Sequence, residues 1–322
     1  MGRVGKRLLS SFINVGNVML EALCARPPFG SAPPGPGSWA ALPSAPSATY
    51  LGTAVAFGSD IFLFGGRAPT AQTNAIRKFN TLTNTWSTVG TLPWSAEAIV
   101  GVVINGLIYV HAGGSGASRF GNLVSFNPSN NAVTVLAGDV ATTGAAAVAI
   151  GNKMYVFGGQ TTNTVLNTIR CYDPVTNQWT ALTPSGVVPT ARYFVSAAAA
   201  DGKMYIVSGA TTGTVVVKSI DVYDPVANAF EQALPISFGI YAMGVGIIGR
   251  YLYVVGGSNQ GPTVDDTRIY NLDTKSWSSG AVLPKKLGYL PMAIVGDKLY
   301  TLGGYSSTAG GGVTDQYLYT PA

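Results

Sequence analysis

Few residues of this 322-residue chain could supply catalytic chemistry. It has one histidine, His111, and two cysteines, Cys24 and Cys171, which stand far apart. A zinc site needs several His, Cys or carboxylate ligands at suitable spacing, and two distant cysteines make no disulfide framework. No glycine-rich stretch precedes a helix as a phosphate-binding loop requires. We therefore expect no metal and no cofactor, and we interpret His111 and Cys171 as buried core residues.

A second group of residues could bind a ligand, because it recurs at matched positions. Fifteen residues before successive glycine pairs stand Tyr50, Glu97, Thr143, Tyr193, Tyr241 and Gly288. In the last copy we expect a hairpin one residue shorter, which gives this place to Tyr289. Polar or aromatic residues follow the glycine pairs. The predicted ligand-binding residues are Tyr50, Arg67, Glu97, Arg119, Arg192, Tyr193, Tyr241, Asn259, Tyr289 and Tyr305.

Tyrosine presents both a flat apolar ring and a hydroxyl, so a ring of such residues suits a sugar or a peptide. The alternative is that a repeated tyrosine only packs against the neighbouring strand. The elements that position these residues decide whether they face one ligand.

Those elements are repeats. The glycine pairs start 46 to 50 residues apart, at Gly65, Ala112, Gly158, Ser208, Gly256 and Gly303, with Ala112 and Ser208 replacing the first glycine. Each pair follows an apolar run such as IFLF or MYVF. Turn sequences such as Asn105-Gly106 and Asp201-Gly202 precede these runs, and such pairs favour tight β-hairpins. Every repeat therefore begins with two antiparallel strands.

The second half of each repeat is equally regular. An aromatic residue such as Tyr172 is followed seven residues later by a large apolar one, here Trp179. The residues between them, Asp173-Pro174-Val175-Thr176-Asn177, favour a tight reversal of the chain. Each repeat thus contains four strands, which is one blade of a β-propeller.

The start of the repeat region supplies the strand that the last repeat lacks. The sixth repeat stops at Tyr319-Thr320-Pro321-Ala322, before any tryptophan, whereas Ser38-Trp39 begins like a fourth strand with no blade before it. We predict an all-β, six-bladed propeller of four-stranded antiparallel blades over 38–322, in which the Trp39 strand completes the last blade. Such closure removes exposed sheet edges.

Glycine pairs after a strand, Tyr-Asp-Pro, and a tryptophan after Thr-Asn resemble the kelch repeat, and the resemblance covers residues 38–322. It implies that the repeated glycines and aromatics are scaffold, and that loops entering the innermost strand share the ligand-binding face with loops between the second and third strands. Copper oxidases of the kelch class use a pair of histidines, which this chain lacks. Six-bladed members include sialic-acid mutarotases, which implies an alternative function with Glu97 and Arg192 or Arg67 as catalytic candidates.

Residues 1–25 differ from the repeats. A basic start and apolar residues near helical spacing fit a signal peptide, a mitochondrial presequence or an amphipathic helix that docks on a partner. Residues 26–37 read RPPFGSAPPGPG, a Pro/Gly-rich linker. No apolar run is long enough for a transmembrane span.

The charge and composition of the chain limit the classes of partner that we expect. Of the formal +5, about +3 lies in the first 38 residues, and no basic cluster suited to nucleic acid follows. Charged residues are only 10% of the chain, which favours an extracellular, surface or virion-associated location over the cytoplasm. We expect a non-enzymatic binding or structural module, with a protein or glycan partner on the propeller face and residues 1–37 tethering it to a larger assembly. A secreted lectin-like adhesion protein is the other alternative.

Overall fold

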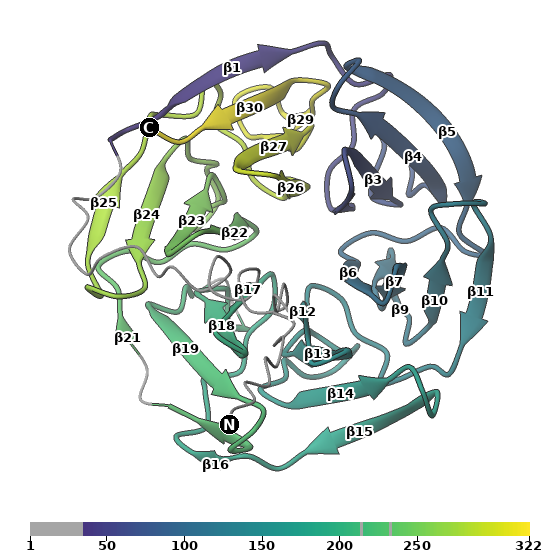
Figure 1. Cartoon of the computed structure of the whole chain (residues 1–322), viewed down its shortest axis with the longest axis vertical. Coiled ribbons are helices and arrows are strands. Elements are labelled where there is room, and N and C mark those ends of the chain that lie inside the picture. Colours follow the sequence, from purple (N-terminus) through teal and green to yellow (C-terminus); the bar gives the residue numbers. More distant parts are fainter. Residues whose placement is uncertain (1–34, 213–214, 232–233) are drawn as a thin grey trace, which may run out of the picture. The chain divides into compact units, whose positions relative to one another are not determined.

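Six antiparallel sheets surround a common axis in the computed structural model, as Figure 1 shows. The structure describes residues 35–322 apart from 213–214 and 232–233, so the predictions for residues 1–25 and for most of the linker lie outside it. Within the described part of the chain, no helix is long and apolar enough to cross a lipid bilayer.

The six sheets are the six predicted blades, and the strands of each follow one another outward from the axis. Blade one contains β2 (Thr53–Phe57), β3 (Asp60–Phe64), β4 (Ala75–Asn80) and β5 (Thr85–Thr91). Blade two contains β6 (Val100–Ile104), β7 (Leu107–His111), β10 (Leu123–Phe126) and β11 (Val133–Leu136). Blade three contains β12 (Ala146–Ile150), β13 (Lys153–Phe157), β14 (Ile169–Asp173) and β15 (Gln178–Leu182).

Blades four to six follow the same plan, with one irregular edge. Blade four contains β17 (Ser196–Ala200), β18 (Lys203–Val207) and β19 (Ser219–Asp224). Its outer edge is divided between β20 (Ala229–Phe230) and β21 (Leu234–Pro235), and β16 (Ser185–Gly186) pairs in parallel with β20. Blade five contains β22 (Gly244–Ile248), β23 (Tyr251–Val255), β24 (Thr267–Asn271) and β25 (Trp277–Ser279).

Blade six closes the ring as predicted. It contains β26 (Met292–Val295), β27 (Lys298–Leu302), β30 (Gln316–Thr320) and, outermost, β1 (Ser38–Leu42). Trp39 pairs with Tyr319 in this sheet. The Trp39 indole also donates to the carbonyl oxygen of Ala281 in blade five at 2.9 Å. The first described strand therefore joins the last strand to its neighbouring blade.

Aromatic residues of the outer strands fasten one blade to the previous one. Trp179 packs on Tyr172, with ring centroids 5.2 Å apart, and its indole donates to the carbonyl oxygen of Ala137 in blade two at 2.9 Å. Trp39 makes the equivalent bond across the closure, so Trp39 and Trp179 are both interblade clamps. The indole nitrogen of Trp86 is buried without such a partner. The resemblance implied this scaffold role.

The glycine pairs are required by backbone conformation and by close approach. Gly66 has φ = 95°, and a Cβ there would lie 2.8 Å from the carbonyl oxygen of Tyr50. Where the first glycine is replaced, Ala112 and Ser208 still adopt positive φ values of 62° and 48°. The geometry is thus kept even where the residue best suited to it is absent.

Two short hairpins are added to the loops that follow the second strands. They are β8 (Gly114–Ser115) with β9 (Ser118–Arg119) in blade two, and β28 (Tyr305–Ser306) with β29 (Gly311–Gly312) in blade six.

Candidate functional site

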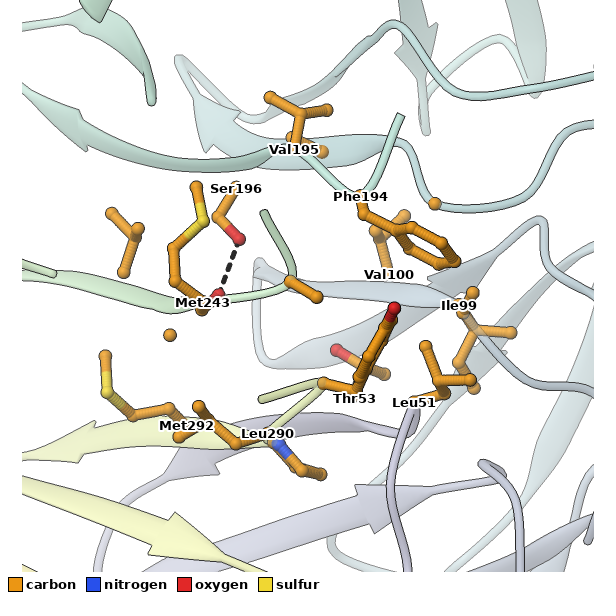
Figure 2. Close-up of a pocket in the computed structure, with 18 of the residues that line it drawn as sticks. Leu51, Thr53, Ile99, Val100, Phe194, Val195, Ser196, Met243, Leu290 and Met292 are labelled. Carbon is orange, nitrogen blue, oxygen red and sulfur yellow. Dashed lines mark hydrogen bonds between the residues drawn. The ribbon is translucent and has the colours of Figure 1, made fainter. Parts of the chain in front are cut away.

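The central channel is lined mainly by small and apolar residues. Its cavity of about 270 Å³ is bounded by the innermost strands of all six blades and the loops that enter them. Figure 2 shows the contributing side chains, among them Leu51, Val100, Phe194 and Met243, with one hydrogen bond from the Ser196 hydroxyl to the Met243 carbonyl oxygen at 2.7 Å. No acidic, basic or histidine side chain is among the lining residues. The charged candidates Arg67, Glu97 and Arg119 lie outside this lining.

The predicted ligand-binding positions meet at the channel mouth in a regular way. In every blade, the residue fifteen positions before the glycine pair forms an isolated antiparallel bridge with the residue just after it. The six bridges are Tyr50–Arg67, Glu97–Gly114, Thr143–Gln160, Tyr193–Ala210, Tyr241–Ser258 and Gly288–Tyr305. The sequence spacing thus corresponds to one structural position.

Tyr289 does not share that position, which corrects one expectation. Gly288 occupies it, because the β26–β27 hairpin has a two-residue turn like that of β22–β23. Tyr289 stands one residue later, where φ is positive in every blade. The φ values there are 59° at Leu51, 53° at Ala98, 65° at Gly144, 46° at Phe194, 55° at Ala242 and 50° at Tyr289.

Backbone hydrogen bonds between blades explain this strained position. The amide of Ala242 donates to the Phe194 carbonyl oxygen at 2.8 Å, and the amide of Tyr289 donates to that of Ala242 at 2.7 Å. The amide of Leu51 continues the series to Tyr289 at 2.9 Å. Ala98 to Leu51 and Gly144 to Ala98 repeat it in blades two and three. The positive φ therefore serves a belt of hydrogen bonds around the channel mouth.

Aromatic rings cover part of this belt in a continuous series, which we call the aromatic row. Its members are Tyr193, Phe194, Tyr241, Tyr289, Tyr305 and Tyr50. The ring centroids are 4.7 Å apart for Tyr193–Phe194, 6.2 Å for Phe194–Tyr241, 6.0 Å for Tyr241–Tyr289, 6.1 Å for Tyr289–Tyr305 and 5.4 Å for Tyr305–Tyr50. The row spans blades four, five, six and one, so the mouth is strongly asymmetric.

Burial raises the pKa of phenols of the row, among them Tyr289 and Tyr50. The pKa of Tyr289 is raised, first by burial and then by the neighbouring hydroxyls of Tyr241, Tyr193 and Tyr305. The pKa of Tyr50 is raised mainly by burial, although Arg67 opposes the shift. These groups are therefore uncharged hydrogen-bond donors at neutral pH.

An ion pair ends the row in blades one and two. The guanidinium of Arg67 lies 3.4 Å from the Glu97 carboxylate, and the Arg67 side chain is 41% exposed against 15% for Glu97. Tyr50 is close enough to both for their charges to act on its pKa. The structure thus brings Arg67 and Glu97 together beside Tyr50, and Arg67 and Glu97 are one of the two pairs named for the mutarotase alternative.

Arg192 does not belong to this surface. Its side chain is fully buried, its guanidinium is paired with Asp221 and donates to the Ser219 hydroxyl at 3.2 Å, and it lies over the Phe157 ring at 5.3 Å. The prediction that Arg192 clamps a ligand at the mouth therefore has to be withdrawn. Its sequence position beside Tyr193 does not reveal that its side chain points between blades three and four.

The two remaining polar candidates lie apart from the row. Arg119 donates to the carbonyl oxygens of Gly116 and Ser118 at 3.0 and 3.1 Å, which occupies it within its own hairpin. Asn259 is exposed at the tip of the β23–β24 loop and lines a separate cleft between blades four and five. Phe194 was missed by the sequence argument, because it stands one residue after the repeated position.

His111 and Cys171 are core residues, as expected. His111 is fully buried, stacks on Trp179 at 4.7 Å, and has its Nδ1 3.2 Å from the Asn122 carbonyl oxygen. Burial, and then the nearby Arg170 charge, lower its pKa to about 3. Burial also raises the pKa of the Cys171 thiol. Among the described residues, no group of three or more His, Cys, Asp or Glu could hold a metal ion.

Comparison with known proteins gives the family. Residues 138–304 match the KLHDC2/KLHL20/DRC7 kelch-repeats domain, and residues 38–212 match the Attractin/LZTR1 β-propeller. Each match spans about half of the chain. Together with the six closed blades, they show that this chain belongs to the kelch-repeat β-propeller family. A kelch propeller of this kind fits a protein-binding module.

The individual relatives are distant. Kelch-like protein 23 of Homo sapiens is 27% identical over 190 residues, which are 58% of this chain and 33% of that protein. Kelch-like protein 35 of Mus musculus is 24% identical over 225 residues, 69% of this chain and 37% of the other. The chain thus spans about a third of the length of these relatives. The solved structure of YjhT, at 18% identity, superposes with a TM-score of 0.76 over 87% of this chain and 97% of its own.

Proposed function

We propose that this protein is a non-enzymatic binding module that recognises a segment of a protein partner along the aromatic row. The observation that supports this proposal is the series of six neighbouring rings across four blades, which ends at the Arg67–Glu97 pair. Aromatic residues and arginine are enriched at protein interfaces, where they bury large area at small entropic cost. Five rings of the row are half-buried, and Tyr241, at 5% exposure, packs against neighbouring members of the row. A partner lying along the row would cover the half-buried rings while its polar groups meet their tyrosine hydroxyls.

The test combines peptide selection with two variants of the row. Peptides selected from a displayed library against the full chain supply the ligand, and Tyr50→Ala and Tyr305→Ala should each weaken its binding at least about tenfold, as for residues that anchor an interface. Leu82→Ala is the matched control, because Leu82 is 79% exposed in the β4–β5 turn. Binding that survives both tyrosine changes would exclude the row. A glycan array run in parallel tests the lectin-like alternative.

A second candidate is a sugar mutarotase, and one observation favours it: Glu97 and Arg67 lie within 3.4 Å at the mouth. In this proposal Glu97 acts as the general acid and base, and Arg67 binds the carboxylate of the substrate. The measurement is the anomer exchange of N-acetylneuraminate by NMR. Glu97→Gln should abolish anomer exchange and preserve the melting temperature. If the parent protein catalyses no exchange, the mutarotase proposal is wrong.

The proposal also includes a tether. Residues 1–37 would attach the propeller to a larger assembly, such as a cell surface or a virus particle. The uneven charge of the sequence supports it, since about +3 of the formal +5 precedes the first strand.

A further inference from the structure

A second cavity, a cleft, lies between blades four and five. Its volume is about 370 Å³, and small-molecule sites commonly fall between about 300 and 1,000 Å³. Its walls are formed by residues 216 and 218 of the loop just before β19, by residues 237–240 of the loop between β21 and β22, and by residues of the β23–β24 loop together with Arg268 of β24. None of the residues of the aromatic row lines it.

Close packing of two of these loops shapes the cleft. A Cβ at Gly239 would collide with the Val216 side chain and lie 3.2 Å from Cγ of Lys218. The loop between β21 and β22 can therefore lie against the stem of Lys218. Ile240, which is 1% exposed, provides an apolar side to the cleft. The stem of Lys218 thus packs near Gly239, while the residue as a whole is exposed at the cleft.

The charges on the cleft do not balance. Lys218 from blade four and Arg268 from blade five both line it, and the single acid among the lining residues is Asp266. Arg268 lies 2.9 Å from Asp266 and stacks over Phe238 at 4.2 Å. Among the described residues, no carboxylate lies within ion-pair distance of Lys218. Lys78, Lys153, Lys203 and Lys285 have such partners. Among the described lysines, Lys275, Lys286 and Lys298 are like Lys218 in having no ion pair, but none of these three lines the cleft.

We propose that this cleft binds the carboxylate of a compact ligand, separately from the partner on the aromatic row. One carboxylate would balance the excess single positive charge, and the fork of Arg268 matches carboxylate geometry. A dianionic phosphate suits the cleft less well, because its second charge would face Asp266. The side-chain amides of Asn259 and Gln260 can bind a hydroxyl or a carbonyl beside the carboxylate. A sugar acid and an acidic side chain of a peptide both carry this chemistry.

Two probes distinguish these sources: D-glucuronate for the sugar acid and N-acetyl-L-glutamate α-amide for the peptide side chain. Each is titrated into the full chain and followed by ligand-observed NMR. Binding of either probe in the millimolar range supports the site, and the tighter probe identifies the source. If neither binds at low salt, the proposal is wrong.

Variants then locate the binding. Lys218→Gln should weaken the bound probe about tenfold, as for one charge-assisted hydrogen bond, whereas Lys218→Arg should retain it. Lys275→Gln is the matched control, because Lys275 is an exposed lysine in the β24–β25 turn of blade five. Arg268→Gln tests the opposite wall, provided that its melting temperature is unchanged. Equal affinity in Lys218→Gln and in the control would overturn the assignment, and Tyr305→Ala should leave this binding unaltered.

Discussion

At the scale of single residues, aromatic side chains connect neighbouring blades. Trp179 illustrates this, because one side chain contacts Tyr172 in its own blade and bonds to the Ala137 carbonyl oxygen in the previous one. Its loss would remove a large apolar surface and leave that carbonyl oxygen without the indole donor. A smaller residue cannot fill this space without a shift of one blade against the other.

We therefore expect Trp179→Ala to lower the free energy of unfolding by about 3–5 kcal/mol, as for large-to-small changes in a packed core. Chemical denaturation followed by circular dichroism measures the change. Val175→Ala is the control, since Val175 is 88% exposed in the preceding turn. A loss below about 1 kcal/mol would contradict the role of Trp179 as a clamp.

The buried His111 predicts a dependence of stability on pH. Asp139 and Arg170 are the charged groups that face it, with His111 Nε2 3.6 Å from the Asp139 carboxylate and Arg170 2.9 Å from the same oxygen. The folded pKa of His111 is lowered to about 3 from 6.5. The unfolded chain therefore takes up this proton first as the pH falls.

His111 should thus contribute stability above pH 6.5 that is lost as the pH falls from 6.5 toward 3. The slope within this window approaches about 1.4 kcal/mol per pH unit. The raised pKa of Asp139 acts in the opposite direction. Denaturation of the parent and of His111→Gln between pH 7 and pH 5 isolates the histidine, and parallel curves would show that it does not titrate this way.

Residue types alone predicted the scaffold but not the orientation of every polar side chain. Trp39 was placed correctly because its neighbours match a repeat that lacks its last strand. Arg192 was misplaced because the residue before a repeated tyrosine can point to the surface or between blades. Nothing in the local sequence identifies Asp221, its partner 29 residues later. Phe194 stands at the positive-φ position, one residue after the repeated position, and its residue type does not suggest a positive φ.

At the scale of elements, the loops are less predictable than the strands. Strand positions follow from repeated apolar runs and turns, which recur in every blade. The cleft between blades four and five depends on three loops that differ in sequence from their counterparts. Its formation also depends on the absence of a side chain at Gly239. Such a site requires the packed loops to be seen together.

The β1 strand gives the sharpest prediction at this scale. It pairs with β30 over five residues, from Ser38–Thr320 to Leu42–Gln316, and Trp39 packs on Tyr319 at 5.0 Å. Deleting residues 1–42 would expose the edge of β30, and an unpaired edge promotes association between chains. Size-exclusion chromatography with light scattering should show oligomers or aggregate. Deletion of residues 1–34 is the control and should leave a monomer-sized propeller. A monomeric product of the longer deletion, with an unchanged melting temperature, would refute closure by β1.

At the scale of the whole molecule, the propeller has two separate recognition regions in the proposed function. The aromatic row lies at the channel mouth from blade four round to blade one, and the cleft lies between blades four and five. A partner on the row and a carboxylate in the cleft need not exclude one another. The proposed tether, residues 1–37, adds a third contact. Its end already belongs to the ring, because the Pro36 carbonyl oxygen accepts a hydrogen bond from Tyr319 at 2.7 Å and β1 begins at Ser38.

This separation predicts that the tether can be removed without loss of the fold. Deletion of residues 1–25 keeps Pro36 and all of β1, so the melting temperature of the propeller and its binding of the selected peptide should not change. Co-sedimentation with the particulate fraction of the producing cells should fall at least severalfold, because attachment through an N-terminal segment would be lost. Full-length Tyr50→Ala is the complementary control, which should sediment normally but bind peptide weakly. Equal sedimentation of the deletion variant and the parent would show that attachment depends on the propeller itself.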